Sequence, residues 1–480
     1  MAGTKFFDVA VIGVDPAGLL AAGRLARKGC RVLVIGQGGG RDFYRLEERE
    51  VPASVGWLPP RGHSPWLDEL LSELNLEDAV RPLGEPARPA LQLITPAERL
   101  DLAAEEEARE AELRRAFASD GERLRGALQR LLVLDRDFRA ALGEQEELPP
   151  ASFWSRLLLR RRQKNHPAAL PPAEEFPFAL RMLLWGNDFL SRLPPASRTP
   201  GLEAHLAAAQ LGGLRLVERL RTHLLTALEK LGVDCREKAV VEHIRFDGRR
   251  VCEIHLLSDS GQYPVGAVLF NLPIGACTKL LPLHRRHRRF ASLAESVRPA
   301  QSIFGIDLVV PQHSLPLGLG SLALVVPPNS PEGREGLLRV QLSMFDAKAN
   351  RVRVNLSRLV PTLERARGNE YLGTVQKQML EAAAWLIPFL SEHQLARSSP
   401  YWTSLAPAED PASPWEIDSV IETEHEIFPG GAVLPVRTMY KNVFFSGPEV
   451  LPGMGVGGAA LAARQAARAV GETVGHRQLL

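Results

Sequence analysis

Residues 8–18 read DVAVIGVDPAG, an apolar run that leads into two glycines separated by four residues. The apolar half is rich in β-branched residues, which is typical of a buried parallel strand. Pro16 suits the first turn of a helix, and the alanine- and leucine-rich segment 19–28 continues that helix. Residues 31–35 form a second apolar run. The sequence therefore predicts a βαβ unit, the setting in which a glycine loop binds the phosphates of a dinucleotide.

The loop of this unit departs from the dinucleotide-binding pattern at one position. In that pattern the first glycine makes the turn, the second lets the backbone approach the pyrophosphate, and the third lets helix and strand pack closely. Gly13 and Gly18 take the first and third positions, with Pro16 and Ala17 between them, but Asp15 takes the second. At about 4 Å, like charges repel by about 4 kcal/mol at an effective dielectric of about 20, unless the side chain turns into solvent. We therefore expect Asp15 to cap its own helix where a pyrophosphate would lie.

Length and composition indicate a globular protein of two or three domains. The chain has 480 residues, of which 45% are hydrophobic and 24% charged. The net charge of +2 predicts no nucleic-acid partner. Four scattered cysteines form no C-x-x-C pair, and twelve histidines show no metal-binding spacing. We therefore assign no metal and expect a cytoplasmic protein.

The rest of the chain alternates between helical and extended patterns. Residues 98–145 predict long solvated helices, and a further amphipathic helix is predicted to begin at Leu211. The turn Asp247-Gly248 between two apolar runs predicts a β-hairpin. Further strands are predicted at 265–271 and 442–446, followed by a glycine-rich loop and a closing helix at 459–470.

Three separated segments together resemble one family of flavoproteins. They are DVAVIGVDPAG (8–18), QLGGLRLVERLRTHLLTALEKLGVDCREKAVVEHIRFDGRRV (210–251) and NVFFSGPEVLPGMGVGGAALAARQAA (442–467). They are similar to the nucleotide-binding opening, the strand beside the adenine, and the C-terminal flavin-contacting motif of phytoene-desaturase-like and amine-oxidase-like proteins.

This resemblance implies an α/β fold of two discontinuous parts. Residues 1–75, 205–285 and 430–480 would form a Rossmann-like FAD/NAD(P)-type domain. Residues 76–204 and 286–429 would form a mixed α+β substrate-type domain with a helical insertion. FAD would lie extended across the first domain, its ring facing an apolar cavity formed with the second. The resemblance assigns FAD contacts to Gly13, Asp15, Pro16, Ala17, Gly18, Gly36, Val241, Gly447, Pro448, Gly453 and Gly455, and it assigns no catalytic residue.

Two further positions depart from the family pattern. Gly36 stands where the family has the acid that accepts hydrogen bonds from the ribose, with the neutral Gln37 after it. Pro448 stands where the family has an aspartate, and proline removes both a carboxylate and a backbone donor. Glu449, one residue on, is expected to point elsewhere. The three departures affect contacts to phosphates and sugars and leave the loop glycines in place.

Two functions follow as alternatives from these observations. The first is a pseudoenzyme, a binding or scaffold protein that uses the cavity for an apolar small molecule or a protein partner. The second is an active FAD-dependent oxidoreductase of the desaturase or amine-oxidase type, in which a hydride passes from substrate to flavin N5. The basic segments 154–164 and 284–290 are either solvated or candidates for peripheral contact with an anionic membrane surface.

Overall fold

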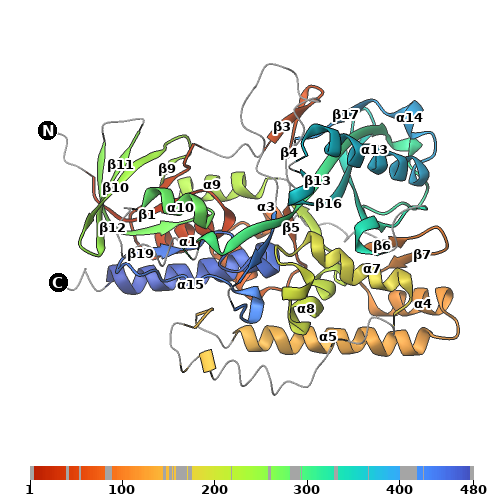
Figure 1. Cartoon of the computed structure of the whole chain (residues 1–480), viewed down its shortest axis with the longest axis horizontal. Helices are drawn as coiled ribbons and strands as arrows, with labels where there is room; N and C mark the ends of the chain where they lie inside the picture. The colour runs from red at the N-terminus through yellow and green to blue at the C-terminus, as the bar shows by residue number, and fades with distance from the viewer. Residues whose placement is uncertain are drawn as a thin grey trace.

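The computed structural model describes most of the chain. The described residues are 5–38, 43–52, 56–81, 89–143, 147–150, 154, 156, 157, 170, 176–217, 219–257, 261–281, 292, 294–328, 333–365, 367–400, 419–424 and 426–475. Figure 1 shows two β-sheets toward opposite ends of the molecule, with helices between them and along one side. Among the helices of these residues, none has the length and apolarity needed to cross a bilayer.

The first sheet is assembled from both ends and the middle of the chain. Its strands are β1 (Phe7–Ile12), β2 (Val32–Ile35), β9 (Asp234–Arg236), β10 (Val241–Asp247), β11 (Arg250–Leu256), β12 (Gln262–Phe270) and β19 (Val443–Phe445). They lie in the order β10-β11-β12-β1-β2-β9, and β19 pairs with β12. The parallel pairs β1·β2 and β1·β12 confirm the predicted βαβ opening, and the antiparallel pair β10·β11 confirms the predicted hairpin.

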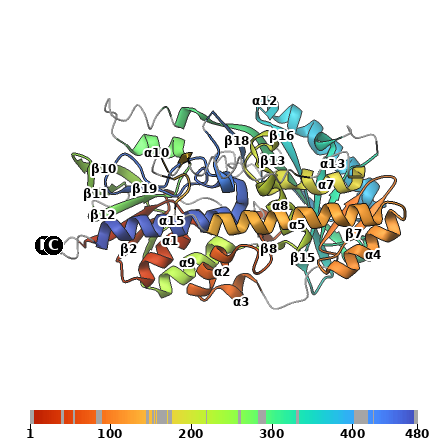
Figure 2. The ribbon, with the colours of Figure 1, turned by 90° about the horizontal axis from the view of Figure 1, so that it is seen from below.

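Helices cover this sheet so that its central strands are buried. They include α1 (Pro16–Arg27), α2 (Pro65–Glu73), α3 (Glu77–Val80), α9 (Leu220–Lys230), α10 (Ile274–Leu280) and α15 (Gly455–Gly475). Figure 2 shows α1, α2, α9 and α15 together on one side, where α1 packs against both α9 and α15. Every residue of β1 is buried, which accounts for a sequence that is apolar at every position except Asp8.

The segment around residue 211 differs from its prediction. A helix does not begin at Leu211: α8 (Pro200–Leu211) ends there. Gly213 has a φ of 87°, a conformation that favours glycine and ends helices. The chain then forms β8 (Arg215–Val217), which pairs with β5 (Gly56–Leu58), before α9 begins. The amphipathic pattern did not indicate this helix end because it continues on both sides of Gly212 and Gly213.

The second sheet is mixed and largely antiparallel. Its strands are β6 (Leu91–Ile94), β7 (Arg99–Leu102), β13 (Val297–Pro311), β14 (Leu322–Val325), β15 (Leu338–Asp346), β16 (Arg351–Pro361), β17 (Ala396–Ser398) and β18 (Ser419–Thr423). The order is β17-β13-β16-β15-β14-β6-β7, with β18 beside β13. The neighbouring helices are α12 (Thr362–Arg365), α13 (Asn369–Leu386) and α14 (Leu390–His393). The fold is therefore α/β, with a Rossmann-like sheet and a second mixed domain.

A third group of elements lies beside the two sheets. The predicted helical region 98–145 contains α4 (Glu106–Ala116) and α5 (Gly121–Gly143), and α5 packs against α8. The remaining regular elements include α7 (Phe178–Gly186), β3 (Phe43–Leu46) and β4 (Arg49–Pro52). Trp154 is 71% exposed. Most of segment 154–164 and all of segment 284–290 lie outside the described residues, so the membrane contact stays a prediction.

Candidate functional site

A cavity of about 260 Å³ lies where the Rossmann-like domain meets the second domain. Its wall combines the first turn of α1, parts of the loop that follows β19, and the start of α15 with Trp57 of β5. The second sheet contributes Ile303 and Val420. The resemblance implied an apolar cavity formed between two such domains.

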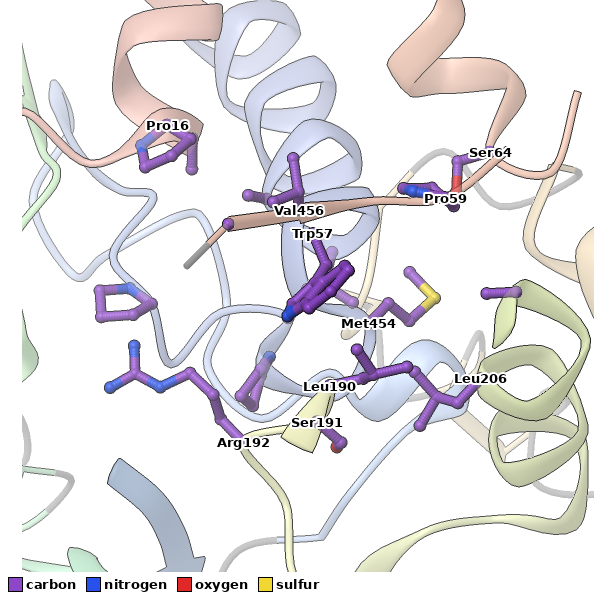
Figure 3. A pocket seen from close by; sticks show the side chains of 18 of the residues that line it. Pro16, Trp57, Pro59, Ser64, Leu190, Ser191, Arg192, Leu206, Met454 and Val456 are labelled. Carbon is purple, nitrogen blue, oxygen red and sulfur yellow. The ribbon is translucent and has the colours of Figure 1, made fainter. Parts of the chain in front are cut away.

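Most of the wall is apolar. Figure 3 shows Trp57 extending into the middle of the pocket, with Leu190 and Met454 beside it. Ser64 and Arg192 lie on opposite sides of the same view. The cavity therefore has apolar walls with polar groups at separate ends.

The glycines of the first loop are required by backbone packing. Gly13 has a φ of 110°, and a Cβ there would lie 2.0 Å from the backbone oxygen of Asn271. A Cβ on Gly18 would lie 2.3 Å from the Asn271 side chain. Both glycines thus permit the loop after β12 to approach the start of α1.

Asn271 joins this loop to α1 and was missed by the sequence reasoning. Its Oδ1 accepts a hydrogen bond from the Gly18 N–H at 3.0 Å, and its Nδ2 donates to the backbone oxygen of Asp15 at 2.8 Å. The residue is 1% exposed. The only signal in the sequence is a polar residue directly after the apolar strand β12, and such residues are common at strand ends.

Replacing Asn271 is expected to destabilise the protein. Asn271→Ala leaves the Gly18 N–H without a partner and removes one of the two hydrogen bonds that the Asp15 C=O accepts, the other being from the Leu19 N–H at 3.2 Å. The loss of the Gly18 partner costs about 1–3 kcal/mol. Gln129, whose side chain is exposed on α5, provides the control. Gln129→Ala also removes an amide, but it should change the free energy of unfolding by less than about 0.5 kcal/mol. Urea unfolding of both variants measures the difference, and equal stabilities would contradict the role given to Asn271.

Asp15 occupies the N-cap position of α1, but its side chain makes no capping hydrogen bond. The prediction that it caps its own helix is therefore wrong. Pro16 has no N–H to offer, and the Gly18 N–H is bound by Asn271. The exposed Asp15 side chain instead forms part of the cavity wall, together with Pro16 and Ala17.

The C-terminal loop also approaches the strand-end loop closely. A Cβ on Gly447 would lie 2.3 Å from the backbone oxygen of Leu272. Gly447, Pro448 and Gly455 line the cavity. Gly453 packs against Gly431. The predicted contact residues of this loop are thus divided between the cavity wall and the packing behind it.

Glu449 is a buried carboxyl behind the cavity wall. It is 6% exposed, and its Oε1 accepts a hydrogen bond from the Ile274 N–H at 3.4 Å, at the start of α10. Its Oε2 is buried without a hydrogen-bond partner among the described residues. Burial raises the pKa of Glu449 to about 7; Arg192 opposes this rise and Asp15 adds to it.

The residues that the resemblance assigns to the adenosine end of FAD contact neighbouring protein segments. A Cβ on Gly36 would lie 2.0 Å from the backbone oxygen of Glu237, so position 36 has no room for a side chain. The Gln37 Oε1 accepts a hydrogen bond from the Val241 N–H at 2.9 Å. None of Gly36, Gln37 and Val241 is part of the cavity wall.

A buried cluster of two histidines and an aspartate also borders the cavity. A hydrogen bond of 2.8 Å joins the Asp135 carboxylate of α5 to the His205 Nδ1 of α8. The His63 Nδ1 lies 3.9 Å from the other Asp135 oxygen. The two imidazole rings stack with centroids 4.2 Å apart. Arg139 lies 3.0 Å from the Asp135 carboxylate. Sequence reasoning missed this cluster because its members come from three distant segments.

One ligand atom from each member of this cluster lies within 4.8 Å of the others, an arrangement that could hold a metal ion. Arg139 already neutralises the carboxylate and opposes a further cation there. The assignment of no metal to this chain stays a prediction.

No protein-family profile and no curated protein sequence matches the chain. Its fold is similar to those of several solved structures. Wild-type putrescine oxidase bound to putrescine is 18% identical, with a TM-score of 0.59 over 97% of this chain and 99% of that one. Cyclohexylamine oxidase from Brevibacterium oxydans is 16% identical, with a TM-score of 0.58 over 98% and 99%. An oxidoreductase from Methanosarcina mazei is 15% identical, with a TM-score of 0.54 over 95% and 98%. The chain therefore has the fold of the amine-oxidase-like flavoproteins that its sequence resembles.

Proposed function

We propose that this protein is a flavoprotein-fold binding protein that does not hold FAD in the extended arrangement implied by the resemblance. It would use the cavity between its domains for a different, smaller ligand. The observation that carries the proposal is the hydrogen bond between the Gln37 Oε1 and the Val241 N–H. That bond occupies a backbone donor on the strand assigned to the adenine.

The ribose position supports the same proposal. An acid at position 36 would accept hydrogen bonds from the ribose hydroxyls, but Gly36 offers no side chain and its Cβ direction meets the Glu237 backbone. Gln37, the neutral neighbour, is bonded to Val241. Ribose hydroxyls buried there without partners would lose about 1–3 kcal/mol each.

The pyrophosphate position is also unsuited to two phosphate charges. Asp15 is at the start of α1, and its negative charge adds to the rise that burial causes in the pKa of Glu449. The Gly18 N–H, which an anion at the helix start could otherwise bind, is bonded to Asn271. The residues present therefore do not fit FAD in the extended arrangement.

A titration with FAD tests this proposal. Wild-type protein is expected to show no saturable change in flavin fluorescence at micromolar FAD. The variant Asp15→Gly/Gln37→Ala/Pro448→Asp frees the Val241 N–H and removes the competing carboxylate, so its affinity should rise at least about tenfold, or about 1.4 kcal/mol.

The exposed Gln312 provides the control, because Gln312→Ala should leave FAD affinity unchanged. Riboflavin, which lacks both phosphates and adenosine, forms a second arm that reports on the ring end alone. Tight binding of FAD by the wild-type chain, equal to that of the triple variant, would support the active oxidoreductase instead.

A further inference from the structure

One aromatic side chain, that of Trp57 on β5, extends into the middle of the cavity (Figure 3). The residue is partly exposed, but its indole Nε1 is buried. The side chain therefore offers the cavity only the carbon atoms of its ring. Leu190 and Met454 lie beside it, and a methionine thioether is a polarizable group that contacts aromatic rings favourably. These groups favour a ligand that is itself apolar where it meets the indole.

A buried arginine of the second sheet lies over the same indole. The guanidinium carbon of Arg339, on β15, is 5.6 Å from the centroid of the Trp57 ring and 4.9 Å from that of the Phe189 ring. Both distances are within the range of a cation–π interaction. Trp57 and Phe189 line the cavity, whereas Arg339 is 6% exposed and is not part of the wall. The guanidinium thus lies behind the wall and contacts two of its aromatic rings.

Hydrogen bonds across the second sheet hold this arginine in place. The Arg339 Nη2 donates to the Ser357 Oγ at 3.1 Å, and that hydroxyl donates to the Asn355 Oδ1 at 2.8 Å. The Asn355 Nδ2 donates in turn to the Asp307 Oδ1 at 2.8 Å. All four residues are buried. Because these bonds connect β15, β16 and β13, the indole of Trp57 rests on paired strands, which position a site more accurately than loops do.

The shape and chemistry of this wall select a planar ring. A flat aromatic ligand can stack on an indole, and such pairs gain stabilisation beyond the apolar area that they bury. A saturated ring of the same size is thicker and makes a poorer contact with the same face. A charged group would lose its hydration against the apolar wall. The volume of about 260 Å³ is slightly below the usual range of about 300–1,000 Å³ for drug-sized ligands, which limits the molecule to a small one.

We propose that the cavity binds a small, uncharged, planar aromatic molecule that stacks on Trp57. Arg339 is the positioning residue that keeps the indole in place for it. This inference rests on the proposed function, because it takes the ligand to be smaller than FAD. It depends on the shape of the ligand ring and on the apolar face of the indole, and it requires no hydrogen bond with the wall.

Three probes that differ in one feature at a time test the proposal. Benzyl alcohol is aromatic and uncharged, cyclohexylmethanol has a saturated ring in place of the aromatic one, and benzylamine carries an ammonium group at pH 7. Isothermal titration calorimetry of the wild-type full chain gives a dissociation constant for each probe. Benzyl alcohol should bind at least about threefold more tightly than either of the other two.

Substitutions of Trp57 test whether this residue provides the stacking surface. Trp57→Leu keeps an apolar side chain but removes the ring, so the affinity ratio of benzyl alcohol to cyclohexylmethanol should fall to about one. Trp57→Phe retains a ring and should keep benzyl alcohol the tighter ligand. Trp385, which is 38% exposed on α13, provides the control. Trp385→Leu should leave all three dissociation constants unchanged.

Substitutions of Arg339 test its positioning role. Arg339→Met removes the guanidinium and should lower the same affinity ratio, whereas Arg339→Lys retains a cation near both rings and should preserve it. A purely structural role would weaken the binding of both alcohols to the same extent and leave their ratio unchanged.

Equal or tighter binding of cyclohexylmethanol or benzylamine by the wild-type chain, or no binding of any probe, would overturn the inference. So would an unchanged affinity ratio in Trp57→Leu. The wild-type comparison decides the ligand class even if that variant does not fold. FAD added to the wild-type sample separates the two proposals. Saturable binding of FAD contradicts the proposed function, whereas the absence of an aromatic preference without FAD binding contradicts only the ligand class.

Discussion

Gly36→Glu is expected to destabilise the protein by more than about 3 kcal/mol, although it restores the acid found in the resembled family. The added Cβ would lie 2.0 Å from the backbone oxygen of Glu237 and 2.6 Å from its carbonyl carbon. These are backbone atoms, so they cannot move aside as the end of a flexible side chain would. The Gly36 N–H also donates to the Arg236 backbone oxygen at 2.9 Å, and this bond extends the pairing of β2 with β9.

A glycine in open space provides the control for this substitution. Gly126 lies within α5, and a Cβ there would meet nothing within 4 Å. Gly126→Glu should therefore be neutral or stabilising by about 0.5–1 kcal/mol, since glycine is unfavourable inside a helix. Thermal and urea unfolding of both variants measure the contrast. If Gly36→Glu is as stable as wild type, the backbone that follows β9 can move away from position 36, and the position assigned to the ribose has room for an acid.

Glu449→Gln is expected to remove a large pH dependence of stability. The pKa of Glu449 is raised by burial from 4.5 to about 7, a shift that corresponds to about 3 kcal/mol between its two protonation states. The folded protein holds this proton more tightly than the unfolded chain does. Stability from this group is therefore complete below about pH 4.5, falls as pH rises, and is lost by about pH 7. The variant should gain stability over wild type across that window.

The control for this titration is a carboxyl whose pKa moves in the opposite direction. Burial raises the pKa of Glu472, but hydrogen bonds from Arg468 and Arg437 outweigh that effect and lower it. Glu472→Gln should therefore lose stability relative to wild type as pH rises through the acid range. Urea unfolding between about pH 3 and 8 measures both differences, with the Glu472 change below about pH 4.5 and the Glu449 change above it. A constant difference between Glu449→Gln and wild type would contradict the burial of an ionisable carboxyl at this position.

The sequence predicted the Rossmann-like part well because its signals are local. A buried parallel strand is largely apolar, and β1 is buried throughout and apolar apart from Asp8, whose carboxylate accepts a hydrogen bond from the Arg31 N–H at 2.7 Å. The hairpin of β10 and β11 follows from the Asp247-Gly248 turn, where Gly248 has a φ of 60°. The helix expected at Leu211 failed for a local reason too, since the turn at Gly213 was overlooked.

The candidate site was harder to predict because it depends on contacts between distant segments. Asn271 lies more than 250 positions from the loop that it holds, and His63, Asp135 and His205 come from three separate segments of the chain. The lack of a hydrogen-bond partner for the Trp57 Nε1, His63 Nε2 and Ser64 Oγ, within the part of the chain that the structure describes, is likewise a property of packing. No spacing pattern in the sequence reports such contacts.

The sequence alone could not show whether the loop glycines are required by packing or by a cofactor. Gly13, Gly18 and Gly447 each face the segment Asn271–Leu272 at distances that exclude a Cβ. Packing of the fold therefore requires these glycines whether or not a cofactor binds. Their presence is evidence for the fold and carries no information on FAD. The positions that bear on FAD are those to which the resemblance assigns contacts with the phosphates and sugars. At those positions Asp15, Gly36 and Pro448 depart from the pattern of the resembled family.

The absorbance spectrum of the purified full-length protein, produced in a host that makes FAD, is the most direct measurement of whether the fold has lost its cofactor. Flavin released by acid from the same sample gives the stoichiometry. We expect a colourless preparation with far less than one flavin per chain, both as purified and after incubation with FAD and gel filtration. A yellow protein that carries close to one FAD per chain would contradict the proposed function.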